Sequence, residues 1–367
     1  MSRSDMLLIG SGGCGNNQLN EILNRSKRYN GLFFNTNMRE MEILNNFDKD
    51  RMCFYIPSAD GTGKDRDLTD RYITEERAKF AETISGFRNV DYVTILSSTN
   101  GGTGSKAATK FPRMTRQVMA VKGVNLISTF PSLDESYIDF NNTLDYWDEL
   151  IDAMDEGFID NVSFIDNNKC KESEINEKLA SGLEDLFNMA KKGNLDNSDL
   201  AHYFEAKGYN LSFKLNSEIH NIKDAIVKAM DDSIFYPLDL DEFDKKIHCE
   251  ACLAVINTNN HNIEELKKTV LSPFKKIKEV SEGDSFIALG GCDLPVYPRD
   301  IIRDALRDLK LQKSRKRRMD LQDLKVGSII DDKEDKIIGD SKKNKTKAKS
   351  NLLSDDFDNI FNDDLWK

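Results

Sequence analysis

Long apolar runs, an excess of positive charge and a second C-x-x-C pair are all missing from the sequence. No segment approaches the roughly 18 apolar residues that would span a bilayer. The polar residues at positions 1–5 lead into only four apolar ones, Met6 to Ile9, which is too short for a secretory signal. These absences predict a cytoplasmic chain that makes no contact with membranes.

The charge balance argues against a protein that coats nucleic acid. The 367 residues include 52 Lys and Arg against 63 Asp and Glu, which gives a net charge of -11. Such a surface repels the phosphate backbone of DNA or RNA. Any contact with DNA is therefore expected to be local or indirect.

The six cysteines are scattered, and a large cytoplasmic chain gives no reason to pair them, so reduced thiols are expected. Only Cys249 and Cys252 form a C-x-x-C pair. Apolar residues alternate through Ile247 to Asn257, which predicts one strand with these two cysteines on opposite faces. No metal site is predicted, because no second pair completes four ligands.

Short apolar segments alternate with longer amphipathic ones in the first 130 residues, a pattern that predicts a parallel α/β sheet. The expected strands are Met6 to Ile9, Leu32 to Phe34, Met52 to Ile56, Tyr92 to Leu96 and Val124 to Phe130. Further on, Ile175, Leu179, Leu183 and Leu186 recur at helical spacing. They predict one long helix over residues 172–192.

A second, smaller α/β region is expected after the long helix. Its strands are placed at Asn210 to Leu215, Ile247 to Asn257 and Ser285 to Leu289, with a helix over Ile263 to Leu271. The whole chain is then divided into a nucleotide-binding domain at 1–170, the central helix and the loop after it at 171–200, a second domain at 201–299, a C-terminal helix at 300–326 and a flexible, charge-segregated tail at 327–367.

Glycine clusters follow the first and the fourth expected strand, at the edge where open α/β sheets bind ligands. Gly10, Gly12 and Gly15 match the G-x-G-x-x-G motif of dinucleotide-binding proteins, but the acid expected about 20 residues later is missing. Gly63-Lys64 suggests a Walker A loop, but two other positions of that motif do not match. Neither motif by itself explains the clusters.

Taken together, the two glycine loops suit a polyphosphate. Only glycine lets the main chain approach a ligand closely, and helix starts offer backbone N–H groups. Each loop taken singly is better explained as a tight turn between a strand and a helix. The residues expected to form the cradle are Gly12, Gly13, Cys14, Gly15, Asn16 and Asn17 in one loop and Asn100, Gly101, Gly102, Thr103, Gly104 and Ser105 in the other.

These loops resemble those of the tubulin and FtsZ superfamily of filament-forming GTPases, whose signature is G-G-T-G-[ST]-G. Asn100 to Lys106 matches it except that the two end residues replace the outer glycines. The resemblance implies that Asn35 and Asn37 belong to a second phosphate loop, and Gly61 and Gly63 to a third that senses the terminal phosphate. GTP and GDP, with Mg²⁺, are the implied ligands, and the domain at 1–170 becomes a GTP-binding domain.

Ribose and base contacts follow from the same resemblance. Glu135 and Asp139 are the implied ribose acids, with Asp134 as an alternative, although an acid-rich helix start explains them equally well. Asn167 and Asn176 are the implied guanine contacts, because an amide offers both the donor and the acceptor that the base edge requires. Without the resemblance, each asparagine would be interpreted as a helix cap or a solvated residue.

The loop after the long helix resembles the synergy loop N-x-D-x-x-D of this superfamily. Asp196 and Asp199 lie three residues apart at a helix start, where two carboxylates can orient an attacking water. An isolated pair of this kind is more simply a capping box. In the family the loop lies opposite the nucleotide, so the resemblance implies hydrolysis of GTP held by the next subunit of a head-to-tail filament.

The C-terminal part is most similar to the branch of the superfamily that moves plasmid or phage DNA during partition. In that branch the tail engages TubR, a DNA-binding adaptor assembled on a centromere. The main alternative is an FtsZ-like cell-division ring GTPase, from whose ribose loop Phe130 to Asp139 departs. A non-hydrolysing nucleotide sensor is a third possibility, because the fourth loop lacks its outer glycines.

Overall fold

The computed structural model describes residues 1–57, 61–189, 195–240 and 246–323, with side chains up to Arg315. Residues Met1–Lys313 form one compact unit, which ends within the last described helix. The tail predicted at 327–367 lies outside the described residues. No described helix is both long and apolar enough to cross a membrane.

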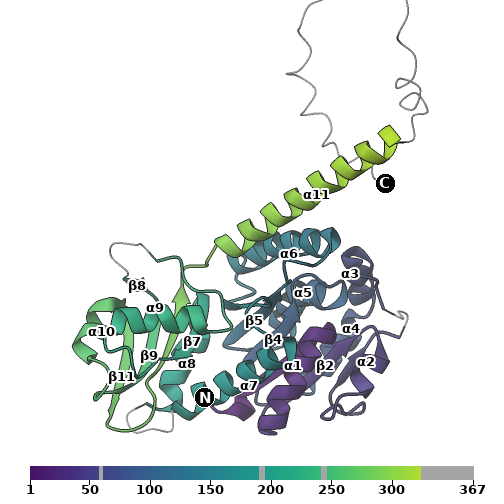
Figure 1. Cartoon of the computed structure of the whole chain (residues 1–367). Coiled ribbons are helices and arrows are strands. Elements are labelled where there is room, and N and C mark those ends of the chain that lie inside the picture. Colours follow the sequence, from purple (N-terminus) through teal and green to yellow (C-terminus); the bar gives the residue numbers. More distant parts are fainter. Residues whose placement is uncertain (58–60, 190–194, 241–245, 324–367) are drawn as a thin grey trace, which may run out of the picture. The chain divides into compact units, whose positions relative to one another are not determined.

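A ten-stranded sheet runs through this compact unit in the order β11-β9-β12-β7-β6-β5-β4-β1-β2-β3 (Figure 1). Strands β1 to β6 pair in parallel, as the alternating pattern predicts, whereas β12 pairs antiparallel with β7 and β9. The bounds are β1 (Met6–Ser11), β2 (Asn30–Asn35), β3 (Cys53–Tyr55), β4 (Tyr92–Ser98), β5 (Gly123–Phe130), β6 (Asn161–Asp166), β7 (Gly208–Lys214), β9 (Ala251–Asn257), β11 (Phe274–Val280) and β12 (Phe286–Cys292), with β8 (Ile247–His248) and β10 (Val270–Leu271) in a separate two-stranded sheet.

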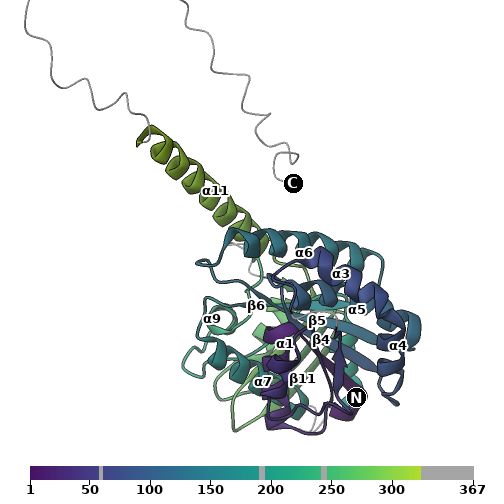
Figure 2. The ribbon, with the colours of Figure 1, turned by 90° about the vertical axis from the view of Figure 1, so that its right-hand side faces the viewer.

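Helices cover both faces of the sheet. They are α1 (Gly12–Arg25), α2 (Met38–Glu42), α3 (Arg66–Glu75), α4 (Arg77–Ser85), α5 (Thr103–Val118), α6 (Tyr137–Asp155), α7 (Glu172–Met189), α8 (Asn197–Glu205), α9 (Ile222–Asp232), α10 (Ile263–Thr269) and α11 (Tyr297–Asp323), preceded by a short 3-10 helix, η1 (Arg3–Asp5). Figure 2 shows α1 and α7 on one side of β4 and β5, and α4 and α5 on the other.

Alternation along β1 explains this layering. Leu7 and Ile9 point into a core cluster shared with α4, α5 and α6, whereas Met6 and Leu8 join a second cluster shared with α1, α7 and α8. A strand whose two faces are both buried needs apolar residues at every position, which is what the sequence has there. The sheet is continuous from β6 to β7 through only two residue pairs. The predicted division into domains within residues 1–313 stays a prediction.

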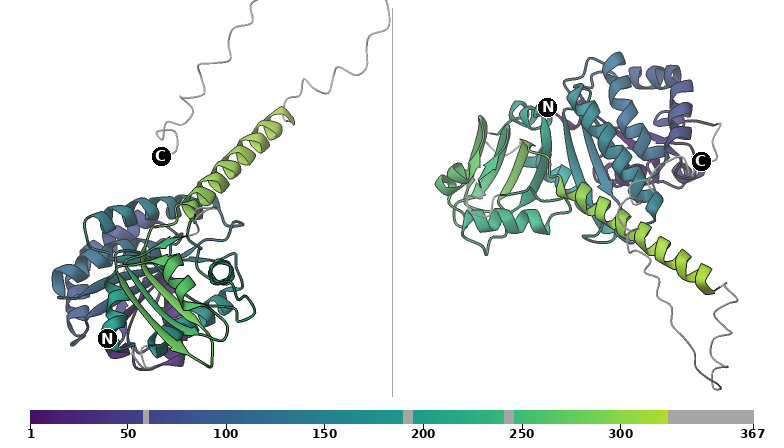
Figure 3. Two further views of the ribbon diagram at one scale, coloured as in Figure 1. Left: turned by 90° about the vertical axis from the view of Figure 1, so that its left-hand side faces the viewer. Right: turned by 90° about the horizontal axis from the view of Figure 1, so that it is seen from above.

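The second part of the sheet corrects one expectation. The predicted single strand Ile247 to Asn257 is broken, because β8 pairs with β10 while β9 pairs with β11 and β12. Cys249 lies at the break, and both Cys249 and Cys252 join the same core cluster rather than opposite faces. The left view of Figure 3 brings the green strands of this part to the front.

Two smaller differences concern element ends. The helix expected over Ile263 to Leu271 ends at Thr269, where β10 begins, and α11 begins at Tyr297 rather than near Asp300. Strand β11 was not anticipated, since Phe274 to Val280 carries three lysines and no clear apolar alternation. It lies at the edge of the sheet, where charged residues are tolerated.

Candidate functional site

The two glycine loops touch each other. They follow β1 and β4, which are neighbours in the sheet. Ser11 Oγ donates a hydrogen bond to Gly104 O at 3.2 Å. A Cβ atom on Gly12 would lie 3.0 Å from Gly104 Cα, and one on Gly104 would lie 2.6 Å from Ser11 O. Glycine is therefore required at both positions, and the two expected loops form one surface.

Neither of the two helices that begin at this surface has a side-chain cap, so the backbone N–H groups of their first turns can face a ligand. Helix α1 begins at Gly12, where φ is +68°, and α5 begins at Thr103. Burial raises the pKa of the Cys14 thiol to about 12, although a hydrogen bond with Thr129 opposes the shift. The thiol is therefore neutral and adds no negative charge beside a phosphate. Amides of two helix starts suit an anion.

Three threonine hydroxyls join the loops. Thr103 Oγ1 lies 2.8 Å from Thr36 Oγ1 and 3.1 Å from Thr62 Oγ1. These residues come from the expected fourth, second and third phosphate loops respectively. Sequence reasoning selected only Thr103; Thr36 stood between two chosen asparagines and Thr62 between two chosen glycines.

Asn35 and Asn37 use their side chains to shape their own loop. Asn35 Oδ1 accepts from the N–H groups of Thr36 and Asn37, at 2.8 and 3.3 Å, and its Nδ2 donates to Glu40. Asn37 caps α2 through the N–H of Arg39. The same amides that were expected to meet a nucleotide therefore hold the turn.

The third loop begins among residues 58–60, which lie outside the described residues. Gly61 and Gly63 both have positive φ, and a Cβ on either would meet nothing within 4 Å. Lys64 also has positive φ, +70°, which is uncommon for a residue with a side chain. Its ammonium lies 2.5 and 2.7 Å from the two carboxylate oxygens of Asp139.

The two expected ribose acids differ in environment. Asp139 is fully buried and completes a capping box with Ser136, the alternative that an acid-rich helix start allowed. Burial alone would raise the pKa of Asp139, but Ser136 and the Lys64 ammonium more than offset it, so the pKa lies below its usual range. Glu135 is half-exposed, and burial together with Asp139 raises its pKa. Glu135 therefore presents the more accessible carboxylate; Asp134 is exposed beside it.

Asn100 contributes to the same cluster from the fourth loop. Its Nδ2 donates to Asp139 at 2.9 Å, and its carbonyl accepts from Asn142 Nδ2 at 2.9 Å. Asn142 also donates to Lys64 O at 2.9 Å and was not singled out from the sequence. An asparagine in place of the outer glycine thus ties the fourth loop to α6.

Of the two asparagines expected to contact the base, Asn167 lies in the turn after β6 and Asn176 lies on α7. Asn176 is 9% exposed, and its Oδ1 has no hydrogen-bond partner among the described residues. An unpaired buried carbonyl is unfavourable unless a ligand supplies a donor. Asn167 is half-buried, and the next residue, Asn168, accepts from Leu133 N at 3.1 Å. The base segment is thereby fastened to the ribose loop.

Asp196 and Asp199 form the capping box that starts α8. Asp196 is exposed and accepts from Ser198 and from Asp199 N; these bonds, Ser198 first, lower its pKa. Asp199 is 5% exposed, accepts from Asp196 N at 3.1 Å and pairs with Lys276 Nζ at 3.3 Å. Gly193 and Asn194 of the same motif lie outside the described residues.

Helix α8 lies at the opposite end of the strands from the glycine loops. Tyr92, the first residue of β4, donates to Glu205, and Asn161, the first residue of β6, donates to Phe204 O. Figure 1 shows α8 at the lower end of the strands and α6 at the upper end. Strand β4 has seven residues, so at about 3.3 Å per residue the two ends are roughly 20 Å apart. The structure therefore does not bring Asp196 and Asp199 together with the phosphate loops.

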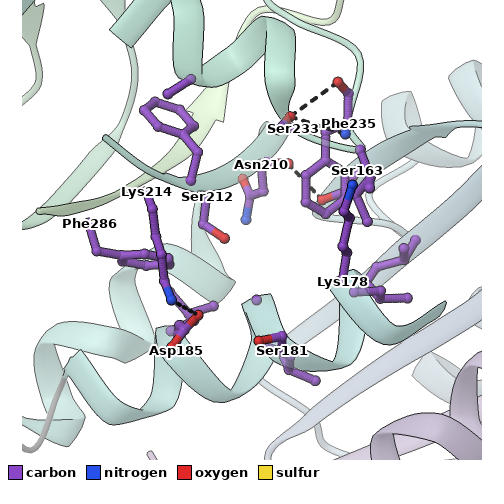
Figure 4. A pocket seen from close by; sticks show the side chains of 18 of the residues that line it. Ser163, Lys178, Ser181, Asp185, Asn210, Ser212, Lys214, Ser233, Phe235 and Phe286 are labelled. Atoms are coloured by element: carbon purple, nitrogen blue, oxygen red, sulfur yellow. Dashed lines mark hydrogen bonds and ion pairs between the residues drawn. The ribbon is translucent and has the colours of Figure 1, made fainter. Parts of the chain in front are cut away.

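A separate cavity of about 380 Å³ lies between α7 and strands β5 to β7 and β12 (Figure 4). Lys214 and Asp185 form an ion pair of 2.9 Å on its wall, and Ser163 donates to Asn210 O. Asn125 also lines it, with no partner for its amide among the described residues. The cavity contains none of the side chains expected to bind nucleotide.

Replacing Gly104 with Ala should separate the two glycine loops. The new Cβ would press on Ser11 O, so we expect GTP affinity to fall at least about tenfold, with a loss of stability of about 1–3 kcal/mol. Fluorescence titration and thermal unfolding measure the two effects. Gly182→Ala on α7 is the control, since nothing lies within 4 Å of its Cβ and helix propensity favours Ala by about 1 kcal/mol. Unchanged affinity in Gly104→Ala would contradict a shared phosphate surface.

The chain is similar in sequence and in structure to TubZ proteins. Tubulin-like protein TubZ of Clostridium botulinum C phage is 24% identical over 359 residues, covering 96% of this chain and 94% of that protein. The tail-truncated Clostridium botulinum phage c-st TubZ structure has a TM-score of 0.75 and 22% identity, covering 84% of this chain and 99% of that one. A GTPγS-form protofilament of Bacillus thuringiensis serovar israelensis TubZ has a TM-score of 0.70 and 16% identity, covering 87% and 94%.

The family match coincides with the part of the chain that carries the phosphate loops. Residues 5–173 match the Tubulin/FtsZ family, GTPase domain. This range contains both contacting glycine loops, the threonine cluster and Asn167, and it ends within the first turn of α7. Residues 5–173 therefore belong to the Tubulin/FtsZ family as its GTPase domain, and the chain as a whole is similar to the TubZ proteins.

Proposed function

We propose that the chain assembles head to tail into a GTP-dependent filament that moves plasmid or phage DNA, and that GTP is hydrolysed between neighbouring subunits. The observation that carries this proposal is the separation of the phosphate loops from Asp196 and Asp199, at opposite ends of the same strands. Carboxylates roughly 20 Å away cannot act on a nucleotide bound in their own chain. They can act on one held by a second copy.

The loops fit a guanine nucleotide. The contact between Gly12 and Gly104 leaves room only for main chain, which suits a polyphosphate. The unpaired Oδ1 of Asn176 is an acceptor for the N1–H or the amino group of guanine. Mg²⁺ usually binds through substrate phosphates with few protein ligands, so it is expected to come with the nucleotide. GDP would occupy the same site after hydrolysis.

The two aspartates have different roles in this proposal. Asp196 is exposed and ionised, so its carboxylate can reach out of the subunit to orient and polarise a water. Asp199 is buried and holds the N–H of Asp196 and the ammonium of Lys276. We therefore assign water activation chiefly to Asp196, with Asp199 fixing its position and adding negative charge.

Several relatives support assembly. One similar structure is a helical model of a two-stranded filament of TubZ-Bt, with a TM-score of 0.72, and another is the GTPγS-form protofilament. Assembly of this chain is inferred from the divided site together with those relatives. Segregation of DNA and an adaptor similar to TubR are inferred from the resemblance and from the charge pattern of residues 327–367.

Asn176→Ala tests the base. Loss of the amide should lower the preference for GTP over ATP by about tenfold or more, because a buried hydrogen bond to the base is removed. Isothermal titration with both nucleotides measures it. Glu177→Gln, an exposed neighbour on the same helix, is the control and should keep the preference. Equal affinity of the unaltered protein for GTP and ATP would exclude guanine selectivity.

Asp196→Asn tests the divided site. The amide keeps the shape and the helix cap but loses the charge, so hydrolysis should fall about 10²- to 10⁴-fold while GTP binding stays the same. At a GTP concentration too low to fill the site of Gly104→Ala, mixing the two variants should restore phosphate release, because Asp196→Asn supplies the nucleotide and Gly104→Ala supplies the carboxylate. No restoration, with turnover per subunit independent of protein concentration, would contradict hydrolysis between subunits. GTP-driven assembly with no hydrolysis in the unaltered protein would favour the non-hydrolysing alternative.

Truncation after Asp331 tests the adaptor. The shortened chain should still assemble with GTP, measured by light scattering, yet lose capture by DNA preloaded with the adaptor. Added salt should weaken capture of the full chain, because exposed charges are screened. A shortened chain that fails to assemble would place the tail in the filament. Undiminished capture would place recruitment elsewhere, and an FtsZ-like role would predict no dependence on adaptor-loaded DNA at all.

A further inference from the structure

A partly buried charge cluster lies next to the fourth phosphate loop. Its centre is Arg66, the first residue of α3, which is 6% exposed. One arm of the guanidinium donates to Ser105 Oγ at 2.5 Å, and the other donates to Glu149 Oε2 at 2.5 Å. A single planar fork therefore joins the fourth loop to α6.

Ser105 passes this contact on to the main chain. Its side chain is fully buried, and its hydroxyl donates to Gly101 O. The Ser105 hydroxyl thus accepts from Arg66 and donates to Gly101 O, so it is not directed at a ligand, although the backbone N–H of Ser105 can be. Through Ser105, Arg66 fixes the peptide of Gly101, in the part of the loop expected to face phosphate.

Glu149 collects the remaining contacts of the cluster. It accepts from Lys106 Nζ and Thr109 Oγ1, both at 2.6 Å, as well as from Arg66. Burial alone would raise the pKa of Glu149, but Arg66, Lys106 and Thr109 more than offset it, so the pKa lies below its usual range. Glu149 therefore stays ionised at neutral pH. The lysine that replaces the outer glycine of the loop is anchored here.

The opposite side of the loop is held by the same stretch of chain. A Cβ on Gly102 would lie 2.5 Å from Thr62 Oγ1 and 2.9 Å from Lys64 Cα. The stretch Thr62 to Arg66 thus contacts the fourth loop twice. A hydroxyl and main-chain atoms lie against Gly102, and a guanidinium donates to Ser105. A displacement of this stretch would therefore also shift the Gly101 peptide.

We propose that Arg66 is a positioning residue for phosphate binding, acting through Ser105 on the Gly101 peptide and held in place by Glu149. The cluster replaces the conformational freedom of glycine at position 106 with a fixed ionic contact. This inference rests on the proposed function only in taking these loops to bind phosphate. In this proposal Arg66 acts through Ser105 and makes no contact with the nucleotide.

Arg66→Lys is the first test. Lysine keeps the charge but has no fork to reach both Ser105 and Glu149. We expect the Kd for GTP to rise about tenfold, as for loss of one hydrogen bond to a charged group, with kcat at saturating GTP within about threefold of the unaltered value. Ser105→Ala should give a similar rise, and the double variant should be little worse than either single one, because both act through one contact.

Glu156→Gln is the matched control. Glu156 follows α6 and pairs with Arg113 of α5, so this pair also links the two helices, but it is half-exposed and far along them from the loop. Its Kd should not change. Glu149→Gln covers the case in which Arg66→Lys does not fold, and it should also raise the Kd about tenfold.

Three results would overturn the inference. They are an unchanged Kd in Arg66→Lys and Ser105→Ala, effects of the two changes that multiply, and a fall in kcat that merely follows the unfolded fraction. Titration with tripolyphosphate separates the two proposals, because it probes the loops without a base. Weak GTP selectivity together with a tripolyphosphate affinity that differs between the variants would refute guanine binding and support the role of Arg66. Strong GTP selectivity together with the same tripolyphosphate affinity in all variants would refute only the role of Arg66.

Discussion

The contact between Gly12 and Gly104 is the constraint on which the rest of the site depends. Two parallel strands bring their loops to one edge of the sheet, and the loops approach so closely that any side chain would push them apart. Polar side chains of the neighbouring loops lie around this contact. The threonine hydroxyls join the second and third loops to it, and Asn100 ties it to α6. A surface of main-chain amides remains at the centre, which is what a polyphosphate needs.

The same sheet explains why the site is divided. Parallel strands carry all of their following loops at one end, so α8, which precedes β7, lies at the other end. The length of β4 alone keeps Asp196 away from the glycine loops. The separation is thus a property of the strands and not of a movable loop. Under the proposed function, chemistry that needs both ends uses two copies of the chain, and hydrolysis would report on contact between subunits.

Departures from the family pattern are compensated locally. Asn100 and Lys106 stand where the signature has glycine, and each has a specific partner: Asp139 for the asparagine and Glu149 for the lysine. Both partners are on α6, so this helix supports the fourth loop at two points. Removing the partly exposed Glu149 would leave the buried Arg66 and the nearby Lys106 without their carboxylate partner, which is unfavourable. The loop is therefore held by polar contacts from α6 where the signature has only glycine.

The parallel pairing of β1 to β6, the long helix and the two glycine loops could be predicted from the sequence, because strand alternation, helical spacing and glycine clusters are local signals. The break between β8 and β9 could not, since which strand a segment pairs with is decided by distant residues, and the alternation continues across the break. Asp139 and Arg66 show the same limit. The sequence by itself determined a parallel nucleotide-binding sheet with two glycine loops and a pair of aspartates. Only the tertiary structure decided that Lys64 pairs with Asp139 and that Arg66 donates to Ser105, because those contacts join residues far apart in the chain.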